Sequence, residues 1–417
     1  MNRPKLLFVT PWEPRPTGSG PAIRAYHSLR ALSELYDPHV LVLGFYSDGG
    51  PAGPPRDLRA VKWEHVRVRN FSERGRRPAK RLIDLSAALY SRLYEKPSEW
   101  RHATSSAIRR AAKVFRGVDF DLVHVYRLFA APFAWPYIKE DRGRPIRKQL
   151  DLEQVESFAR RRMALLYEAN GNALKAWSLM YDAEQYRRIE RSELSRWDRL
   201  YVSSELDVER LGKRVSIGNI EVLPNVVEDF APDRDSQQTR EPFRFLFVGQ
   251  LDHYPNADAV RFFLRKIWPS VRRWAGQDVA FDIVGAGGSD VLMQEVTRTP
   301  GAQWIGAVND LQVFYQQADA VVAPVRAGGG TRVKVVEAFA HRVPVVATSV
   351  AAEGLDVLPE RHLLVADAPL RFAQGCLRLI ENAELRNWLR RNAFDLYRES
   401  YLPKAMRDVL LGSLPRF

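Results

Sequence analysis

Short apolar runs, each followed by a loop and then by a stretch with helical periodicity, recur in both halves of this chain. In the first half they include Lys5–Thr10, Asp121–Tyr126 and Arg147–Leu152, and in the second half Arg244–Val248 and Ala320–Val325. Strands that alternate with helices are typical of parallel sheets with helices on both faces. The chain is therefore predicted to be an α/β protein with two Rossmann-like domains.

A polar stretch near the middle of the chain separates the two sets of runs. Residues 228–241 include the segment DRDSQQTRE and follow the turn-like run Val222–Asn225. A length of 417 residues leaves room for two or three domains at about 150 residues each. We expect an N-terminal domain at 1–225, a C-terminal domain at 226–395 and a separate helical segment at 396–417.

Composition excludes several classes of protein. Hydrophobic residues make up 46% of the chain and charged residues 27%, whereas a disordered chain combines low hydrophobicity with high net charge. The single cysteine, Cys376, excludes an internal disulfide framework and a zinc site built on several cysteines. It also favours a reducing compartment, so a cytoplasmic location is expected. No apolar run approaches the roughly 20 residues that a membrane-spanning helix needs.

The net charge of +13 is unevenly distributed. Basic side chains far outnumber acidic ones between Arg74 and Arg116. Such a patch favours anionic partners, namely phospholipid headgroups, nucleic acid or phosphorylated substrates. A solvated helical face is the alternative interpretation. Charge is the only feature that supports a nucleic-acid partner, because the sequence shows neither zinc-finger spacing nor an aromatic RNA-binding signature. No specific nucleic-acid partner is therefore expected.

The segment Ala323–Val350 carries the strongest chemical signal in the sequence. An apolar run there leads into Gly328, Gly329 and Gly330 and then into a helical stretch. Glycines let the backbone approach a ligand closely, and Thr331 is expected to cap the helix. Because the first N–H groups of a helix and its dipole attract phosphate, a diphosphate is predicted to bind here.

Charged side chains of the following helix would complete such a site. Arg332 and Lys334 are the predicted counter-charges for the diphosphate. Glu337 lies three residues after Lys334 and therefore beside it on the helix surface. We expect Glu337 to accept hydrogen bonds from sugar or ribose hydroxyls. The alternative is a glycine-rich turn with nothing more than a surface Lys–Glu pair.

The sequence GGGTRVKVVEAFAHRVPVVAT, followed by Glu353–Leu355, resembles the donor-site signature of family-4 glycosyltransferases. This stretch and Leu251–Asn256 are most similar to the sugar transferases associated with exopolysaccharide export systems. The resemblance covers most of the chain but is weak between about 45 and 195. The other segments that resemble the family are Val9–Leu32, Ser203–Glu205, Val222–Asn225, Phe245–Gly249, Ile283–Gly288, Trp304–Leu311 and Tyr315–Pro324.

The resemblance implies a GT-B fold, in which two Rossmann-like domains carry parallel sheets that face each other across a cleft. It also implies transfer of a sugar from a nucleoside-diphosphate sugar to a glycan or lipid-linked acceptor, with retention and without a metal ion or another cofactor. The segment 396–417 is expected to pack back on the N-terminal domain. The implied donor-binding residues are Gly249, Gly285, Gly306, Val308, Gly328, Gly329, Gly330, Thr331 and Glu353.

Two features depart from the family pattern. The family carries two glutamates separated by seven residues, and Glu337 fits the second position whereas Gly329 occupies the first. The loop after the first strand of the C-terminal domain supplies neither the arginine nor the lysine that many members carry there. We hypothesise that Arg332 and Lys334 neutralise the diphosphate instead. Two other activities stay open: a nucleotide-sugar epimerase of the same fold, and a protein that binds a nucleotide sugar without catalysis.

The N-terminal domain is expected to bind the acceptor. His124 and Asp151 each lie near the end of a strand-like run, where residues of a binding cleft belong in such folds. They join Glu337, Lys334 and Arg332 as candidate catalytic residues. A core histidine and a helix cap are the respective alternatives. The basic window would border this side, which suits a lipid-diphosphate acceptor at the inner membrane face or an anionic glycan. The candidate acceptor-binding residues are Gly18, Ser19, Gly20 and Arg24.

Overall fold

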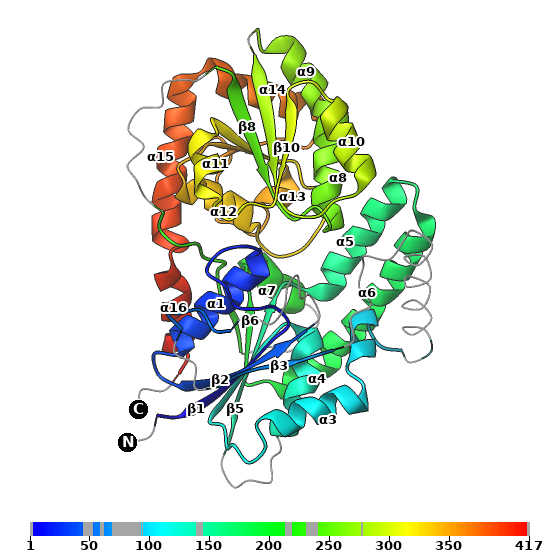
Figure 1. The fold of residues 1–417 in the computed structure, drawn as a ribbon, viewed down its shortest axis with the longest axis vertical. Helices are drawn as coiled ribbons and strands as arrows, with labels where there is room; N and C mark the ends of the chain where they lie inside the picture. The colour runs from blue at the N-terminus through cyan, green and yellow to red at the C-terminus, as the bar shows by residue number, and fades with distance from the viewer. Residues whose placement is uncertain are drawn as a thin grey trace. The chain divides into compact units, whose positions relative to one another are not determined.

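The computed structural model describes residues 3–44, 53–58, 62–68, 93, 95–138, 145–212, 219–230, 241–276 and 278–414. Its contacts divide the chain into an N-terminal unit, Met1–Pro224 with Met406–Phe417, and a C-terminal unit, Asn225–Ala405. Both are α/β units built on a parallel sheet with helices on its two faces, so the predicted fold class is confirmed (Figure 1). Residues 74–92 of the basic window and 231–240 of the polar stretch lie outside the described residues.

The sheet of the N-terminal unit has seven strands among the described residues, in the order β3-β2-β1-β4-β5-β6-β7. Its strands are β1 (Lys5–Thr10), β2 (Asp37–Leu43), β3 (Lys62–Val66), β4 (Leu122–Tyr126), β5 (Arg147–Glu153), β6 (Arg199–Val202) and β7 (Ile220–Val222). The central strands are apolar and buried because helices cover both faces. The strand order reverses between β1 and β4, so the loops after these two strands border the usual ligand-binding edge.

The helices of the N-terminal unit connect these strands. Among the described residues, the α-helices of this unit are α1 (Gly20–Leu32), α3 (Ser105–Val114), α4 (Ala131–Ala134), α5 (Glu156–Ala169), α6 (Ala173–Glu193), α7 (Glu205–Gly212) and α16 (Pro403–Gly412), which alone of these connects no strands. The last of these follows the C-terminal unit in sequence and returns to pack on α1. Met406 is fully buried there and accepts a hydrogen bond at its Sδ from Ser28 Oγ at 3.5 Å. Arg407 forms an ion pair with Glu34 at 2.7 Å.

The sheet of the C-terminal unit has six strands among the described residues, in the order β10-β9-β8-β11-β12-β13. Its strands are β8 (Phe243–Val248), β9 (Val279–Val284), β10 (Ala302–Gly306), β11 (Ala320–Ala323), β12 (Val345–Ala347) and β13 (Leu364–Val365). The strand order reverses between β8 and β11. The edge at which these two strands end is therefore the expected binding edge of this unit.

The helices of the C-terminal unit surround a core of buried aliphatic and aromatic side chains. They are α8 (Tyr254–Phe262), α9 (Trp268–Trp274), α10 (Asp290–Arg298), α11 (Gln312–Gln317), α12 (Val333–Ala340), α13 (Ser349–Ala352), α14 (Pro369–Glu381) and α15 (Ala383–Ser400). A π-helical turn, Phe263–Ile267, joins α8 to α9. Cys376 is buried in this core.

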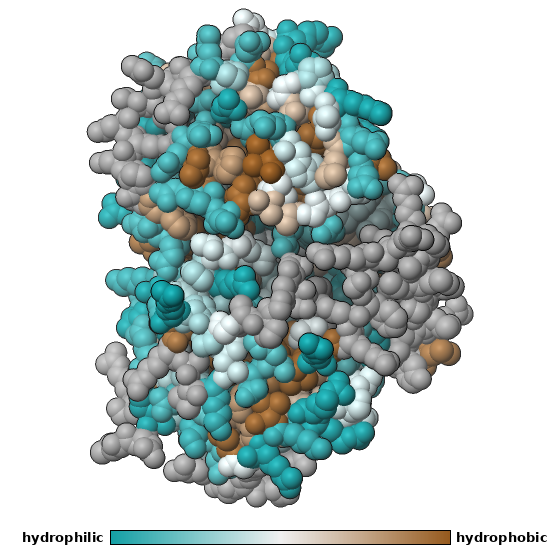
Figure 2. Space-filling model, in the orientation of Figure 1, coloured by the Kyte–Doolittle hydropathy of each residue, from teal (hydrophilic) through white to brown (hydrophobic). Residues whose placement is uncertain are grey.

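The surface turned to the viewer in Figure 2 is mostly hydrophilic, with a few separate apolar patches. Within the described part of the chain, no helix is both long enough and apolar enough to span a membrane.

Candidate functional site

Three glycines line the carboxyl edge of the C-terminal sheet. Gly249 follows β8, Gly285 follows β9 and Gly306 ends β10. The N–H of Gly249 donates to Val284 O at 2.9 Å, and that of Gly285 donates to Gly306 O at 2.8 Å. A Cβ on Gly285, whose φ is +154°, would lie 1.9 Å from Gly249 O. Only glycine fits there, so this edge presents bare backbone to a ligand.

The glycine loop joins β11 to α12. Gly328 and Gly330 have φ values of +132° and +65°, which glycine adopts without strain. The helix begins at Val333 with Arg332 as its N-cap, so the prediction that Thr331 caps it is wrong. Thr331 Oγ1 instead accepts a hydrogen bond from Asn225 Nδ2 at 2.8 Å. Thr331 is thus a buried anchor of the loop.

Arg332 lies against the glycine loop. Its Nη1 donates to Gly329 O at 2.5 Å and, more weakly, to Gly330 O at 3.4 Å. A Cβ on Gly328 would lie 2.7 Å from Arg332 Nη2. The guanidinium group therefore fixes the shape of the loop and adds positive charge to it.

Lys334 lies at the carboxyl end of β8. Its Nζ donates to Asn256 Oδ1 at 2.9 Å and lies 4.0 Å from the centre of the Phe247 ring. A Cβ on Gly249 would be only 2.8 Å from the same nitrogen. Burial, and then the charge of Arg332, lower the pKa of Lys334 to about 7. Lys334, predicted from the pattern of the helix, thus lies beside Gly249, which the family resemblance implied.

Glu337 lies one turn further along α12 and is buried. Its Oε2 accepts a hydrogen bond from the Tyr315 hydroxyl at 3.0 Å. The Tyr315 ring stacks on His341 at 4.4 Å, and Phe230 stacks on His341 at 4.8 Å. Burial raises the pKa of Glu337, against the effect of the Tyr315 hydrogen bond and of Lys334. The carboxylate is therefore held in one orientation by an aromatic stack.

The remaining donor-side candidates lie on neighbouring loops of the same unit. Val308 is half-buried two residues beyond the end of β10. Glu353 is half-buried at the C-cap of α13, directly before Gly354 with its φ of +77°. Among the described residues, no cluster of three or more His, Cys, Asp or Glu could hold a metal ion.

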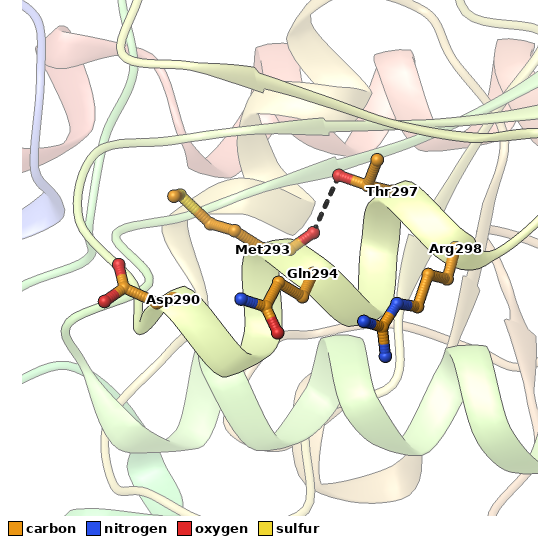
Figure 3. A pocket seen from close by; sticks show the side chains of 5 residues that line it. All are labelled: Asp290, Met293, Gln294, Thr297 and Arg298. Carbon is orange, nitrogen blue, oxygen red and sulfur yellow. Dashed lines mark hydrogen bonds between the residues drawn. The ribbon is translucent and has the colours of Figure 1, made fainter.

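A hollow of about 380 Å³ lies along α10 (Figure 3). All its lining residues belong to that one helix, and Thr297 Oγ1 donates to Met293 O at 2.9 Å within it. No residue predicted for the donor or acceptor site lines it. The hollow is a groove along a helix surface and does not coincide with the glycine-lined edge. Its lining residues are Asp290, Met293, Gln294, Thr297 and Arg298.

In the N-terminal unit, Arg24 and Asp151 form a fully buried ion pair. Arg24 Nε and Nη2 donate to the two carboxylate oxygens of Asp151 at 2.8 and 2.7 Å. Arg24 Nη1 also donates to Leu223 O at 2.9 Å, and Asp151 Oδ1 accepts from Glu153 N at 3.0 Å. The pair ties α1 to β5 and to the chain beyond β7. This geometry favours a structural role for both residues.

His124 lies in the middle of β4 and is fully buried. Its Nδ1 is 3.0 Å from Gln149 Oε1, and its ring stacks on Phe8 at 5.2 Å. Burial lowers the pKa of His124, and Asp151 opposes that shift. The strand ends two residues later, so His124 is a core residue of the sheet by position.

The predicted glycine loop of the N-terminal unit precedes α1. Gly18 has a φ of +114° with open space where a Cβ would project. Ser19 is the N-cap of α1, and its carbonyl accepts from Ile23 N at 3.0 Å. These residues adjoin the helix that carries Arg24, whereas His124 and Asp151 belong to strands β4 and β5.

A buried cluster of charged and aromatic side chains lies at the ends of β4 and β5, and none of its members was among the predicted site residues. Arg127 and Glu153 both have positive φ values, 74° and 62°, in a region that strains residues with a Cβ. Arg127 Nη1 donates to Glu153 Oε2 at 2.7 Å, and the Tyr126 hydroxyl donates to the same oxygen at 2.5 Å. The guanidinium carbon of Arg127 also lies 5.7 Å from the centre of the Trp12 ring. The available signal was a charged residue at the carboxyl end of each apolar run.

The match to a known protein family lies within the C-terminal unit. Residues 242–382 match the family model described as "Glycosyl transferases group 1". The chain is also 21% identical over 244 residues to an uncharacterised 44.6 kDa protein in the cps region of Klebsiella pneumoniae. That match covers 57% of this chain and 61% of the relative, so it leaves more than a third of the relative unmatched.

Solved structures resemble the whole chain. Sucrose-phosphate synthase from Thermosynechococcus elongatus has a TM-score of 0.67 at 15% identity, over 98% of this chain and 97% of that one. Anabaena HepE in complex with UDP and glucose has a TM-score of 0.63 at 13% identity, over 99% of this chain and 100% of that one. The chain therefore has a GT-B fold of two Rossmann-like domains, and its C-terminal unit carries a glycosyltransferase group 1 match.

Proposed function

We propose that this protein is a retaining glycosyltransferase that transfers a sugar from a nucleoside-diphosphate sugar to an acceptor hydroxyl in polysaccharide or glycoconjugate synthesis. The observation that carries the proposal is the position of Lys334, whose ammonium group adjoins Gly249 at the end of β8. The strand order reverses between β8 and β11, and ligands of doubly wound sheets bind at such a point. A diphosphate there would meet Lys334, the glycine loop and the start of α12.

The proposed mechanism follows from the charges that develop during transfer. Departure of a nucleoside diphosphate places negative charge on its phosphate oxygens, while the sugar becomes positively charged. Lys334, Arg332 and the N–H groups at the start of α12 would stabilise the leaving phosphates. Glu337 would accept hydrogen bonds from sugar or ribose hydroxyls. The acceptor would attack the face that the phosphate leaves, and the phosphate would take up its proton, so no enzyme nucleophile is needed.

We assign acceptor binding to the N-terminal unit. The strand order there reverses between β1 and β4, and Trp12 and Arg127 follow these two strands. An aromatic ring beside a charged cluster suits a sugar-containing acceptor, which offers both apolar ring faces and hydroxyls. Gly18–Gly20 would adjoin it before α1. The cps-region relative supports a polysaccharide context, and the excess of basic residues in 74–116 suits an anionic glycan or a lipid-diphosphate acceptor.

Two other activities fit the same donor site. Gly329 leaves the position of the first family glutamate without a carboxylate, which suits a protein that binds a nucleotide sugar without transferring it. A nucleotide-sugar epimerase would convert the donor without any acceptor. Analysis of products from a nucleotide sugar, with and without oligosaccharide acceptors, distinguishes sugar transfer, epimerisation and binding without catalysis. Transfer with retention would appear as an unchanged anomeric configuration in the product NMR spectrum.

The first test is thermal unfolding of the full chain with a panel of nucleoside diphosphates and nucleotide sugars, with and without EDTA. A ligand that binds only the native state at 100 times its Kd stabilises it by about 2.7 kcal/mol. We expect one nucleotide family to raise the midpoint selectively and EDTA to leave the rise unchanged. A rise that EDTA abolishes would contradict metal independence, and no rise with any nucleotide would overturn the donor site.

A further inference from the structure

The hairpin of α5 and α6 exposes large apolar side chains close to its turn. Leu174, Trp177 and Met180 of α6 are 60%, 49% and 39% exposed, and Leu165 of α5 is 50% exposed. All four lie within ten residues of the turn at 170–172. Single exposed apolar side chains are ordinary, but a group of them marks an interaction surface.

The apolar residues of α6 form a stripe on the outward face of the helix. The inward face buries Ala176, Leu179, Ala183 and Tyr186, among others. Leu174, Trp177 and Tyr181 follow one another at spacings of three and four, so they share the opposite face. The Trp177 and Tyr181 rings stack with their centres 6.4 Å apart. The helix therefore has a second apolar face in addition to the one that builds the core.

The hairpin is held firmly without help from this outward face. Glu190 of α6 accepts hydrogen bonds from Ser157 N at 2.9 Å and Ser157 Oγ at 2.6 Å, at the first turn of α5. Asp182 of α6 accepts from Ser98 N at 2.7 Å. Asn172 caps α6 by accepting from Lys175 N at 3.1 Å. The outward stripe is thus a stable feature of a well-anchored element.

The two helices carry an excess of positive charge, and two of their arginines, Arg187 and Arg188, form ion pairs with Glu184. Basic side chains that are not buried outnumber acidic ones along the two helices. Trp and Tyr are the residues favoured where a bilayer meets water, and nearby Lys and Arg add attraction to anionic headgroups. The basic residues are Arg160, Arg161, Arg162, Lys175, Arg187, Arg188 and Arg191, and the acidic ones are Glu168, Glu184 and Glu193.

We propose that this face of α5 and α6 binds an anionic lipid surface, with α6 lying in the plane of the headgroups. Leu174, Trp177 and Met180 would enter the boundary of the acyl chains while the arginines contact lipid phosphates. A second copy of the chain fits less well, because a two-fold contact would place this basic face against itself. This inference does not depend on the proposed transferase activity.

The test is co-sedimentation of the full chain with phosphatidylglycerol-rich vesicles and with pure phosphatidylcholine vesicles. We expect binding to the anionic vesicles that weakens with salt. Loss of two interfacial side chains in L174S/W177S should lower the vesicle partition coefficient by at least about tenfold. L370S is the matched control, because Leu370 is 58% exposed on α14 of the other unit, and it should bind like the wild type.

The replaced side chains are exposed, so both variants should keep the wild-type melting temperature. Failure of the wild type to bind anionic vesicles would overturn the inference, as would equal binding by L174S/W177S and the wild type. If light scattering shows a wild-type dimer that L174S/W177S converts to a monomer, without vesicle binding, the face joins two copies and the lipid assignment is wrong.

Discussion

At the scale of the single residue, the fold buries the Lys334 amine at the proposed donor site and lowers its pKa. Its pKa of about 7 leaves the amine only partly protonated near neutral pH. A bound diphosphate would raise that pKa, because a nearby opposite charge favours the protonated form. Binding of the diphosphate and uptake of a proton are therefore coupled at one side chain.

Replacement of Lys334 by methionine keeps most of its packing against Phe247 and removes the charge. A charged hydrogen bond contributes about 1.5–3 kcal/mol, so we expect nucleoside-diphosphate affinity to fall roughly 10- to 100-fold, as measured by calorimetry. Lys266→Met is the control, since Lys266 is exposed on the π-helical turn. Unchanged affinity and turnover in K334M would remove Lys334 from the donor site.

The same residue predicts a pH dependence. Above pH 7 the free protein loses the Lys334 proton, whereas the bound state keeps it, so binding must take up a proton. Affinity for a nucleoside diphosphate should therefore fall as the pH rises above about 7, by up to about tenfold per pH unit. Titrations at increasing pH check this, and K334M should flatten the dependence. A steep wild-type slope that persists in K334M would place the proton on another group.

Asp151→Asn separates a structural role from a catalytic one. It would leave the buried Arg24 without its counter-charge, and breaking a buried pair costs about 3–5 kcal/mol. We expect urea unfolding to show a loss of that size for the N-terminal unit, and a smaller loss in the double variant R24M/D151L. Wild-type stability together with abolished transfer would instead assign Asp151 to the chemistry.

At the scale of the element, the donor site depends on where strands stop. A glycine follows β8 and β9 and is the last residue of β10, and backbone hydrogen bonds join the three strands at that edge. Replacement of Gly285 by alanine would push a Cβ into Gly249 O. We expect a loss of about 3 kcal/mol in unfolding free energy, with weaker nucleotide binding.

Gly276→Ala is the control for that change. Gly276 also has a positive φ, +66°, but no atom lies within 4 Å of where its Cβ would project. Only the backbone strain of a left-handed residue with a Cβ remains, so chemical denaturation should show a loss of about 1–2 kcal/mol and nucleotide binding should be unaffected. Equal losses of unfolding free energy in the two variants would mean that the close contact at Gly285 does not contribute to the cost of the alanine substitution.

The sequence predicted the elements of the donor site better than the contacts between them. The glycine loop before α12 is a local pattern, and the family resemblance added Gly249 and Gly285 because each directly follows an apolar run. The partner of Lys334 is Asn256, 78 residues earlier, and no local pattern links the two. Arg127 and Glu153 are separated by 26 residues, and their pairing depends on the order of strands in the sheet.

At the scale of the whole molecule, the N-terminal unit is discontinuous in sequence. Residues 406–417 complete it after the chain has passed through the entire C-terminal unit. Met406 and Leu410 of α16 are both fully buried, and Ser413 Oγ lies 2.8 Å from the Tyr201 hydroxyl. The core of the first unit thus depends on side chains from the last helix.

The double variant M406A/L410A should therefore destabilise the N-terminal unit. Each truncation of a buried Leu or Met costs about 2–5 kcal/mol. We therefore expect scanning calorimetry to show the unfolding transition of the N-terminal unit at a lower temperature than in the wild type. The transition of the C-terminal unit should stay in place. Two unchanged transitions, or a shift confined to the C-terminal unit, would contradict the assignment of α16.

The return of α16 also determines when each unit can mature during synthesis. Domains usually fold in the order in which they leave the ribosome. Here the C-terminal unit has all its residues once Ala405 has been made, while the N-terminal unit still lacks Met406 and Leu410. The unit translated first is therefore completed only after the second unit, and a nascent chain stalled at Ala405 would hold one complete unit and one incomplete unit.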